Sequence, residues 1–334
     1  MQLPLELRSA IEHELAGWSA KELGSLAADV SGRYRSPAPA PGGRLIRRPE
    51  EVVAYAAFRL PATYAALHAV LTQVKEEQPG WSPRSLLDVG AGPGTATWAA
   101  ADVFPTLSQA TLLERDDAMI DFGRRLAARA AHAVVREATW VKADATAAWE
   151  APPHDLVIAS YILGELPEDA REPFVRKLWE STAGMLLLIE PGTPRGFGHI
   201  HAARQRLIDL GAALAAPCPH AGPCPIAGSD WCHFSQRVER SRLHRQVKDA
   251  ELSYEDEKFS FVVASRLPAA PVPGRVIRHP QVRKGYLDLH VCTADGRATT
   301  VRVTRKARDR YRQARDLRWG SPLPPDVMDP PDPH

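Results

Sequence analysis

The sequence predicts an α/β fold built on a doubly wound parallel sheet, and three observations support this prediction. Apolar runs alternate with helical stretches through the middle of the 334-residue chain, as in strand-helix repeats. The first run leads into a glycine-rich turn that is followed by an alanine-rich helical stretch. An acidic residue closes the second run, 20 residues beyond the last of three glycines. Together these features predict a strand, turn and helix that bind a nucleotide.

The residues ahead of the sheet predict a helical region over residues 1–80. Two amphipathic helical patterns occupy residues 3–34, where apolar side chains recur on one face. The proline-rich residues 36–43 predict a stiff linker. A further helical pattern covers residues 50–77 and contains Pro61, which breaks or kinks a helix because proline has no amide donor.

The expected nucleotide-binding domain covers residues 81–267. Ligands of such sheets bind beyond the carboxyl ends of the parallel strands, so residues at those ends are candidate ligand contacts. A helical pattern at residues 198–214 and a last core-like strand at residues 258–265 complete the domain. The five parallel strands are expected at residues 85–90, 110–114, 138–142, 155–160 and 184–190.

The C-terminal part predicts a small basic β domain over residues 268–319, which begins with a proline-rich linker. Residues 306–318 predict a basic helix, and the proline-rich tail at residues 320–334 is expected to be disordered. The strands of this domain are expected around residues 275–278, 285–292 and 298–304.

Three glycines, Gly90, Gly92 and Gly94, form the turn after the first strand. Glycine lets the backbone turn sharply and approach a ligand without a Cβ atom in the way. These glycines fall at every second position, whereas the dinucleotide fingerprint Gly-x-Gly-x-x-Gly places a pyrophosphate on the helix N-terminus. Pro93 also removes one amide donor from the loop. The turn therefore favours a ligand without phosphates.

Two carboxylates are candidate contacts to a nucleoside. Glu114, at the end of the second strand, can accept hydrogen bonds from both ribose hydroxyls. Asp144 is a candidate acceptor for the adenine amino group, and the alternative is that it caps a helix or belongs to a loop. The pattern resembles the first two motifs of class I S-adenosylmethionine-dependent methyltransferases. That resemblance implies a Rossmann-like fold with a cofactor site at Asp88, Gly90, Gly92, Gly94, Glu114, Asp144 and Ser160.

The chain contains four cysteines, and three of them fall in the loop at residues 215–235, which is rich in proline and glycine. Disulfides are rare in cytoplasmic proteins, so these thiols predict a metal site. Four thiolates could hold zinc or an iron-sulfur cluster. No Cys-x-x-Cys pair of the zinc-knuckle type is present, and the wider spacing fits a bulkier cluster, but spacing alone leaves both open. The candidate ligands are Cys218, Cys224, Cys232 and Cys292.

Five segments carry a resemblance to one known family: residues 54–66, 88–95, 218–225, 230–237 and 252–260. They are similar to the methyltransferase-like assembly factors of the small ribosomal subunit, of the Rsm-twenty-two or methyltransferase-like-seventeen type, and suggest a bacterial member. The resemblance implies a class I methyltransferase fold and a 4Fe–4S cluster on the four cysteines. It also implies association with small-subunit ribosomal RNA in a pre-30S particle.

Charge is spread unevenly, although the net charge is only +2. Residues 275–318 carry 13 Lys and Arg against 4 Asp, a net of +9, which leaves −7 for the other residues. This asymmetry favours a polyanion partner, which we expect to be RNA and not DNA; the alternative is an ordinary solvated charged face. We expect a cytoplasmic protein without a membrane span, because no apolar run approaches about 18 residues and the N-terminus has no signal-peptide pattern.

The sequence identifies no catalytic residue. Residues 160–163 lack the prolines of the motif that usually marks amino-group methylation of bases, and the cysteines needed for carbon-5 methylation are assigned to the metal site. Tyr161 could stack on a base and Glu165 could act as a general base, but each could also be structural. Three functions remain open: an RNA methyltransferase, a catalytically inactive RNA-binding assembly factor that keeps the cofactor pocket, and a small-molecule methyltransferase or NAD-type enzyme.

Overall fold

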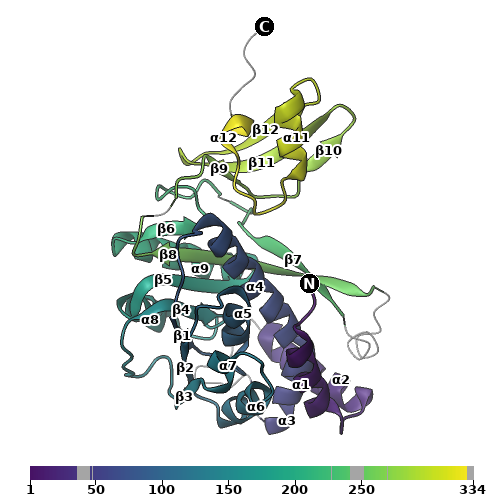
Figure 1. Cartoon of the computed structure of the whole chain (residues 1–334), viewed down its shortest axis with the longest axis vertical. Helices are drawn as coiled ribbons and strands as arrows, with labels where there is room; N and C mark the ends of the chain where they lie inside the picture. The colour runs from purple at the N-terminus through teal and green to yellow at the C-terminus, as the bar shows by residue number, and fades with distance from the viewer. Residues whose placement is uncertain (36–45, 47, 227, 241–251, 269, 329–334) are drawn as a thin grey trace. The chain divides into compact units, whose positions relative to one another are not determined.

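The computed structural model of the chain describes residues 1–35, 46, 48–226, 228–240, 252–268 and 270–328 (Figure 1). Internal packing divides the chain into two units. The first unit comprises residues 1–184 with 236–257, and the second comprises residues 185–235 with 258–334. This division passes through the middle of the segment 81–267 that we expected to be one domain. The expected linker at residues 36–43 lies outside the described residues.

Four N-terminal helices belong to the first unit. The helical segment is interrupted at Arg59, and a new helix begins with Pro61 in its first turn. Proline is tolerated there because the amide that it lacks would have no partner within the helix. Ser19 and Glu22 cap the second helix reciprocally, since the Ser19 amide donates to Glu22 Oε2 at 2.9 Å and the Glu22 amide donates to Ser19 Oγ at 3.2 Å. The fourth helix packs against α5 (Thr95–Val103), the first and third pack against α6 (Asp117–Ala127), and the second packs against the third (Figure 1). Their bounds are α1 Leu5–Leu15, α2 Ala20–Arg35, α3 Pro49–Phe58 and α4 Leu60–Glu77.

The first unit also contains four parallel strands. The central strand β1 pairs with β2 on one side and β4 on the other, and β3 pairs with β2. Leu86, Leu87 and Val89 are fully buried, as expected for a strand covered on both faces. The strands are β1 Ser85–Val89, β2 Gln109–Glu114, β3 Thr139–Lys142 and β4 His154–Ser160, and the helices between and after them are α5 Thr95–Val103, α6 Asp117–Ala127, α7 Ala133–Arg136 and α8 Glu168–Glu180.

The parallel strands of the first unit are hydrogen-bonded in the order β3-β2-β1-β4. This order confirms the expected Rossmann-like α/β fold. In the second unit, strand β8 runs antiparallel to β5 and to β6, and β7 pairs with β8. The bounds of these strands are β5 Thr182–Pro191, β6 Ala213–Ala216, β7 Phe234–Glu239 and β8 Tyr254–Ser265.

One element after β5 differs from the prediction. The helix expected at residues 198–214 is α9 Pro194–Asp209, which Thr193 caps by accepting a hydrogen bond from the Gly196 amide. The helix cannot continue because Gly211 has a φ of +80°. The alanine-rich residues that follow then pair with β8 as the strand β6, which their composition did not predict.

The expected small β domain forms a four-stranded sheet in the second unit. Its order is β10-β11-β12, with β9 paired to β11. Apolar residues on one face of this sheet form a core with α11 and α12. The bounds are β9 Gly274–Val276, β10 Gln281–Arg283, β11 Tyr286–Thr293, β12 Ala298–Thr304, α11 Arg308–Asp316 and α12 Pro325–Met328.

The prediction of disorder from residue 320 onward is wrong for residues 320–328. Leu323 and Val327 are 1% and 0% exposed and belong to the core of the small sheet. Two apolar side chains among many prolines were enough to anchor this segment, because the sheet offers them a buried site. Residues 329–334 lie outside the described part.

Among the described helices, none combines the length and the apolar composition needed to cross a membrane.

Candidate functional site

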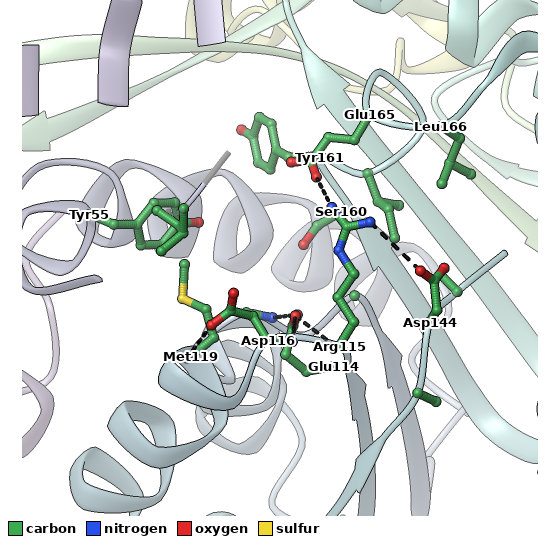
Figure 2. Close-up of a pocket in the computed structure, with 16 residues that line it drawn as sticks. Tyr55, Glu114, Arg115, Asp116, Met119, Asp144, Ser160, Tyr161, Glu165 and Leu166 are labelled. Atoms are coloured by element: carbon green, nitrogen blue, oxygen red, sulfur yellow. Dashed lines mark hydrogen bonds and ion pairs between the residues drawn. The ribbon is translucent and has the colours of Figure 1, made fainter. Parts of the chain in front are cut away.

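A pocket lies at the carboxyl ends of the four parallel strands of the first unit (Figure 2). Five of the seven predicted cofactor residues line it, namely Gly90, Gly92, Glu114, Asp144 and Ser160. Asp88 and Gly94 are not among the lining residues. The other residues that line the pocket are Ile46, Tyr55, Arg115, Asp116, Met119, Ala143, Ala145, Tyr161, Ile162, Glu165 and Leu166.

The Glu114 carboxylate is held by three backbone amides. Its Oε2 accepts from Gly92 at 2.8 Å, and its Oε1 accepts from Arg115 at 2.8 Å and from Asp116 at 2.9 Å. Burial raises the pKa of Glu114, and these amide hydrogen bonds partly oppose that rise. A carboxylate offers about four lone-pair sites, so acceptor capacity remains for ribose hydroxyls. These backbone amides at the end of β2 and in the glycine turn therefore orient the Glu114 carboxylate.

The three glycines of the turn have different roles. Gly90 has a φ of +71°, and a Cβ there would lie 2.4 Å from Cδ1 of Ile162, so no larger residue fits without moving Ile162. Gly92 has a φ of +53° and faces open space within the pocket. Gly94 begins α5, and a Cβ there would press against the rings of Trp140 at 3.3 Å. Gly94 thus serves packing, which explains its position outside the pocket.

Arg115 extends across the strand ends toward two acids (Figure 2). Its guanidinium lies 3.8 Å from Asp144 Oδ2 and 4.0 Å from Glu165 Oε2. Hydrogen bonds from Thr146 lower the pKa of Asp144. Sequence reasoning missed Arg115, although it directly follows Glu114 and so had to lie at the same strand end. A nucleoside that reaches Asp144 must share the site with this guanidinium or displace it.

The pocket is acidic overall. Among the described residues that line it, four carboxylates, from Glu114, Asp116, Asp144 and Glu165, face the single cation of Arg115. A site with this excess of negative charge favours a cationic ligand.

Tyr161, at the end of β4, has a strained backbone. Its φ of +57° lies in the left-handed region that aromatic residues seldom adopt, at a cost of about 1–3 kcal/mol. The Tyr161 hydroxyl donates to Glu257 Oε1 at 3.2 Å, and Glu257 pairs with Arg59 at 3.4 Å. The Arg59 guanidinium also lies 5.7 Å from the centre of the Tyr161 ring. Strain held by such contacts at a pocket wall is typical of a functional position.

Asp88, on β1, is fully buried and is not among the residues that line the pocket. Its Oδ2 accepts a hydrogen bond from Thr97 Oγ1 of α5 at 3.3 Å. Burial raises the pKa of Asp88 to about 7, with the Glu114 charge contributing in the same direction and Thr97 opposing it. The carboxyl therefore joins β1 to α5 in the structure.

The four cysteines line one cavity in the second unit. Burial raises the pKa of the Cys232 thiol, and the charges of Cys218, Cys224 and Cys292 raise it further. The same causes, burial first, raise the pKa of Cys292 to about 12. Four residues spread over 75 positions of the chain are thus close enough to interact electrostatically.

The cavity does not present the geometry of a single-ion site. Within the described residues, no three His, Cys, Asp or Glu side chains converge as ligands of one metal ion. His220 approaches the site, with its Nε2 atom 3.5 Å from Cys292 Sγ. Aromatic and aliphatic side chains form much of the wall, including Phe197, Ile200, Ile226, Phe234, Phe261 and Ile277.

Comparisons with known proteins match most of the chain. The family model described as mitochondrial small ribosomal subunit Rsm22 matches residues 49–324. The human ribosome assembly protein METTL17, mitochondrial, is 28% identical over 297 residues, which cover 81% of this chain and 62% of that protein. Rsm22-cox11 tandem protein 2, mitochondrial, of Schizosaccharomyces pombe is 28% identical over 328 residues, covering 82% of this chain and 43% of that protein. The chain thus spans less than two thirds of either relative.

Two methyltransferases are among the solved structures that the chain matches. Magnesium protoporphyrin IX methyltransferase of Synechocystis PCC 6803, with bound S-adenosylhomocysteine, is 13% identical with a TM-score of 0.41, covering 62% of this chain and 84% of that one. The N-methyltransferase NodS of Bradyrhizobium japonicum is 14% identical with a TM-score of 0.38, covering 59% of this chain and 93% of that one. The fold assignment rests on the strand order and pairing.

The buried carboxyl of Asp88 predicts a pH-dependent stability. Its pKa of about 7 in the folded chain lies above the ordinary value of 3.8, so the folded chain holds a proton that the unfolded chain releases between these values. The free energy of unfolding should therefore fall as pH rises through this window, by at most about 4 kcal/mol at 1.36 kcal/mol per unit. The substitution Asp88→Asn removes this penalty, so the variant should gain stability relative to the parent as pH rises.

Urea unfolding at several pH values between about 4 and 8 measures this difference. The matched control is Asp121→Asn, at an exposed position of α6, which should leave the pH dependence unchanged. A stability difference between Asp88→Asn and the parent that stays constant across this range would show that Asp88 does not titrate there.

Proposed function

The chain belongs to the family of the mitochondrial small ribosomal subunit protein Rsm22, and from this premise we propose that it is a methyltransferase-like factor that binds S-adenosylmethionine and acts in assembly of the small ribosomal subunit. One relative bears the name ribosome assembly protein, which supports the assembly role. The observation that carries the cofactor proposal is the amide-held Glu114 carboxylate beside the open face of Gly92.

The pocket residues fit a nucleoside without phosphates. Glu114 accepts the ribose hydroxyls, and Asp144 accepts from the adenine amino group after exchanging its contact with Arg115. The turn offers few free amides for a phosphate, because the Gly92 amide is already bonded to Glu114 and residue 93 is proline. The same features disfavour a dinucleotide.

The acidic lining fits a sulfonium. S-adenosylmethionine carries a positive sulfur and supplies a methyl group to a nucleophile by in-line displacement. The protein then needs mainly to position the acceptor and exclude water, so few catalytic side chains are required. Tyr161 and Glu165 line the pocket and are our candidates for contact with an acceptor. We propose that Tyr161 orients the acceptor, because its strained backbone lies at the pocket wall.

A catalytically inactive factor is the second candidate. It is favoured by the Ser160 to Leu163 segment, which lacks the prolines of amino-methylating enzymes, and by the engagement of the Tyr161 hydroxyl with Glu257. In this case the cofactor would stabilise the fold for RNA binding without methyl transfer.

The cysteine cavity is proposed to hold a 4Fe–4S cluster. In such a cluster each thiolate binds a different iron, so the four sulfurs surround a volume and do not converge on one point. This requirement agrees with four cysteines that line one cavity. Zinc on these thiolates is the alternative. A bound cluster would tie β11, through Cys292, to the loop that carries the other three cysteines.

The proposed partner is small-subunit ribosomal RNA in a pre-30S particle. Helix α11 places Arg308, Arg312 and Arg315 one turn apart, all exposed, with Arg305 and Lys306 preceding them. Evenly spaced cations of this kind suit contacts with successive phosphates.

The cofactor proposal predicts that Gly92→Arg removes S-adenosylmethionine binding. The new side chain enters the open space of the pocket, so affinity should fall at least about tenfold, equivalent to about 1.4 kcal/mol. Isothermal titration calorimetry measures this. Gly211→Arg is the matched control, because Gly211 also has a positive φ and open surroundings but does not line the pocket. Equal affinity in the parent and Gly92→Arg would refute the site.

The cluster proposal predicts that Cys292→Ser loses the metal, since one of four thiolates is removed. Iron, acid-labile sulfide and zinc are measured on protein purified without oxygen. The parent should contain iron and sulfide in equal amounts, and the variant should lose most of both. Ala298→Ser is the control, because it places the same hydroxyl on the β12 residue that faces Cys292 in register. Zinc in place of iron would support the alternative, and metal that survives Cys292→Ser would contradict both.

The assembly proposal predicts binding to small ribosomal subunits that weakens with salt. A double variant of α11, Arg308→Glu with Arg312→Glu, should co-sediment about tenfold less, or more weakly still, at moderate salt. The control is a double variant that reverses two exposed charges on and beside α6, Arg124→Glu with Arg129→Glu, and its co-sedimentation should not change. Incorporation of labelled methyl groups into RNA from a deletion strain separates the enzyme from the inactive factor. Equal co-sedimentation of both double variants would contradict the role of α11.

A further inference from the structure

The small sheet of the second unit has one apolar face and one polar face. Leu287 and Leu289 of β11 belong to the buried core that this sheet forms with α11 and α12. Because side chains alternate along a strand, Tyr286 and Asp288 lie on the opposite face. The strand register places Arg283 of β10 beside Tyr286, and Arg302 of β12 beside Asp288. These four residues define what we call the polar face.

The two ends of β11 differ in what surrounds them. At one end Cys292 pairs in register with Arg275, and both residues belong to the wall of the cysteine cavity. At the other end Arg283 and Arg302 are exposed. The accessible part of the polar face is therefore the part around Tyr286.

Two neighbours hold the Arg302 guanidinium in a fixed orientation. Its Nε donates to Asp288 Oδ1 at 2.8 Å, and its Nη2 donates to Asp288 Oδ2 at 2.9 Å. Its Cζ lies over the Tyr286 ring, 4.3 Å from the ring centre. A bidentate contact with a carboxylate fixes the plane of a guanidinium, and an aromatic ring beneath the plane is a favourable cation–π partner. Arg302 is thus oriented before any ligand arrives.

This guanidinium also remains accessible. The Arg302 side chain is 59% exposed, although that of Asp288 is only 13% exposed. Hydrogen bonds from Arg302 lower the pKa of Asp288, so the acid is ionised at neutral pH and keeps its hold on the guanidinium. The edge formed by Nε and Nη2, which could bind a phosphate bidentately, is therefore occupied. The flat side turned away from Tyr286 is left for a ligand.

Cations gather beside the accessible part of the polar face. Residues 281–306 contain six Lys and Arg against two Asp, a net charge of +4. The Arg305 amide donates to the Gly285 carbonyl at 2.9 Å, which brings the end of β12 to the turn between β10 and β11. This excess of positive charge favours an anionic partner. The exposed cations around the turn are Arg283, Lys284, Arg305 and Lys306.

Resting on the proposed RNA role, we propose that the polar face is a binding site for single-stranded RNA, in which an unpaired base stacks on the Arg302 guanidinium and the flanking phosphates contact the four exposed cations. Unpaired RNA bases stack on guanidinium planes as they do on aromatic rings. A base inside a duplex is covered on both sides by its neighbours, so the site selects unpaired nucleotides. Tyr286 and Asp288 act as positioning residues, because they orient Arg302 and do not themselves contact the base.

Removing the bases from the ligand separates stacking from phosphate binding. The probes are an oligouridylate of about ten nucleotides and a ribose-phosphate chain of the same length without bases. Fluorescence anisotropy measures the affinity of the full chain for each probe. We expect the oligouridylate to bind about tenfold more tightly, since one stacked base contributes about this factor. Equal affinity for the two probes would show that the face recognises phosphates alone and would overturn the stacking site.

Arg302→Lys keeps the positive charge but removes the flat group and its bidentate contact. The preference for the oligouridylate should fall from about tenfold to nearly none, while the dependence of affinity on salt stays the same because the number of cations is unchanged. Arg297→Lys is the matched control. Arg297 is also an exposed arginine that pairs with an aspartate, Asp295, but it lies in the turn at the opposite end of β11. Its substitution should leave the preference unchanged.

Asp288→Asn separates the orientation of Arg302 from its presence. The substitution removes one negative charge and frees the guanidinium edge, so the baseless chain should bind more tightly, with a salt slope steeper by about one. The preference for the oligouridylate should fall, because the guanidinium plane is no longer fixed. A purely structural role for the ion pair would instead lower the melting temperature and leave the preference for bases as in the parent.

Failure of the stacking site can be distinguished from failure of the RNA role. A parent chain that binds neither probe and does not co-sediment with small ribosomal subunits overturns both. A parent that co-sediments with the subunits, but binds the oligouridylate no better than the baseless chain, overturns the stacking site alone. A folded Arg302→Lys variant that retains the full preference for bases does the same. The comparison of the two probes on the parent requires no variant, so it decides the question even if a substitution impairs folding.

Discussion

The candidate cofactor site depends on one interaction, the hydrogen bond from the Gly92 amide to the Glu114 carboxylate. It connects the turn after β1 to the end of β2, and the amides of Arg115 and Asp116 complete the hold on the same carboxylate. Parallel pairing of β1 with β2 brings these two chain segments to one edge of the sheet. The first of these hydrogen bonds joins residues 22 positions apart, so the acceptor is aimed by sheet pairing and not by local chain preference.

The second candidate site depends on electrostatics of a different kind. Among the described lining residues, the strand-end pocket gathers carboxylates around one half-buried arginine, Arg115. The cysteine cavity is lined by buried arginines and thiols, with no carboxylate among its described wall residues. The first environment favours a cationic ligand.

Several features of the fold were readable from residue patterns because their causes are local. The apolar runs at β1, β2, β4 and β5 marked buried strands, Pro61 marked a helix boundary, and three glycines marked the turn. Strand β6 and the ordered segment after residue 320 were missed, since alanines and scattered apolar residues between prolines carry no periodic signal. Those segments are ordered by the partners that they meet in the folded chain.

The candidate sites show the same distinction. The sequence by itself determined the residue types at both sites. The glycine turn, Glu114 and Asp144 could be assigned to strand ends, because the carboxyl ends of parallel strands lie at one edge of the sheet. The four cysteines could be identified from their residue type and spacing. Only the tertiary structure decided that Asp88 and Gly94 lie outside the pocket, that Arg115 crosses it, and that Arg204 and Arg275 are buried beside the cysteines. The physical reason is that burial and charge compensation depend on residues far apart in the chain, whose proximity no local pattern encodes.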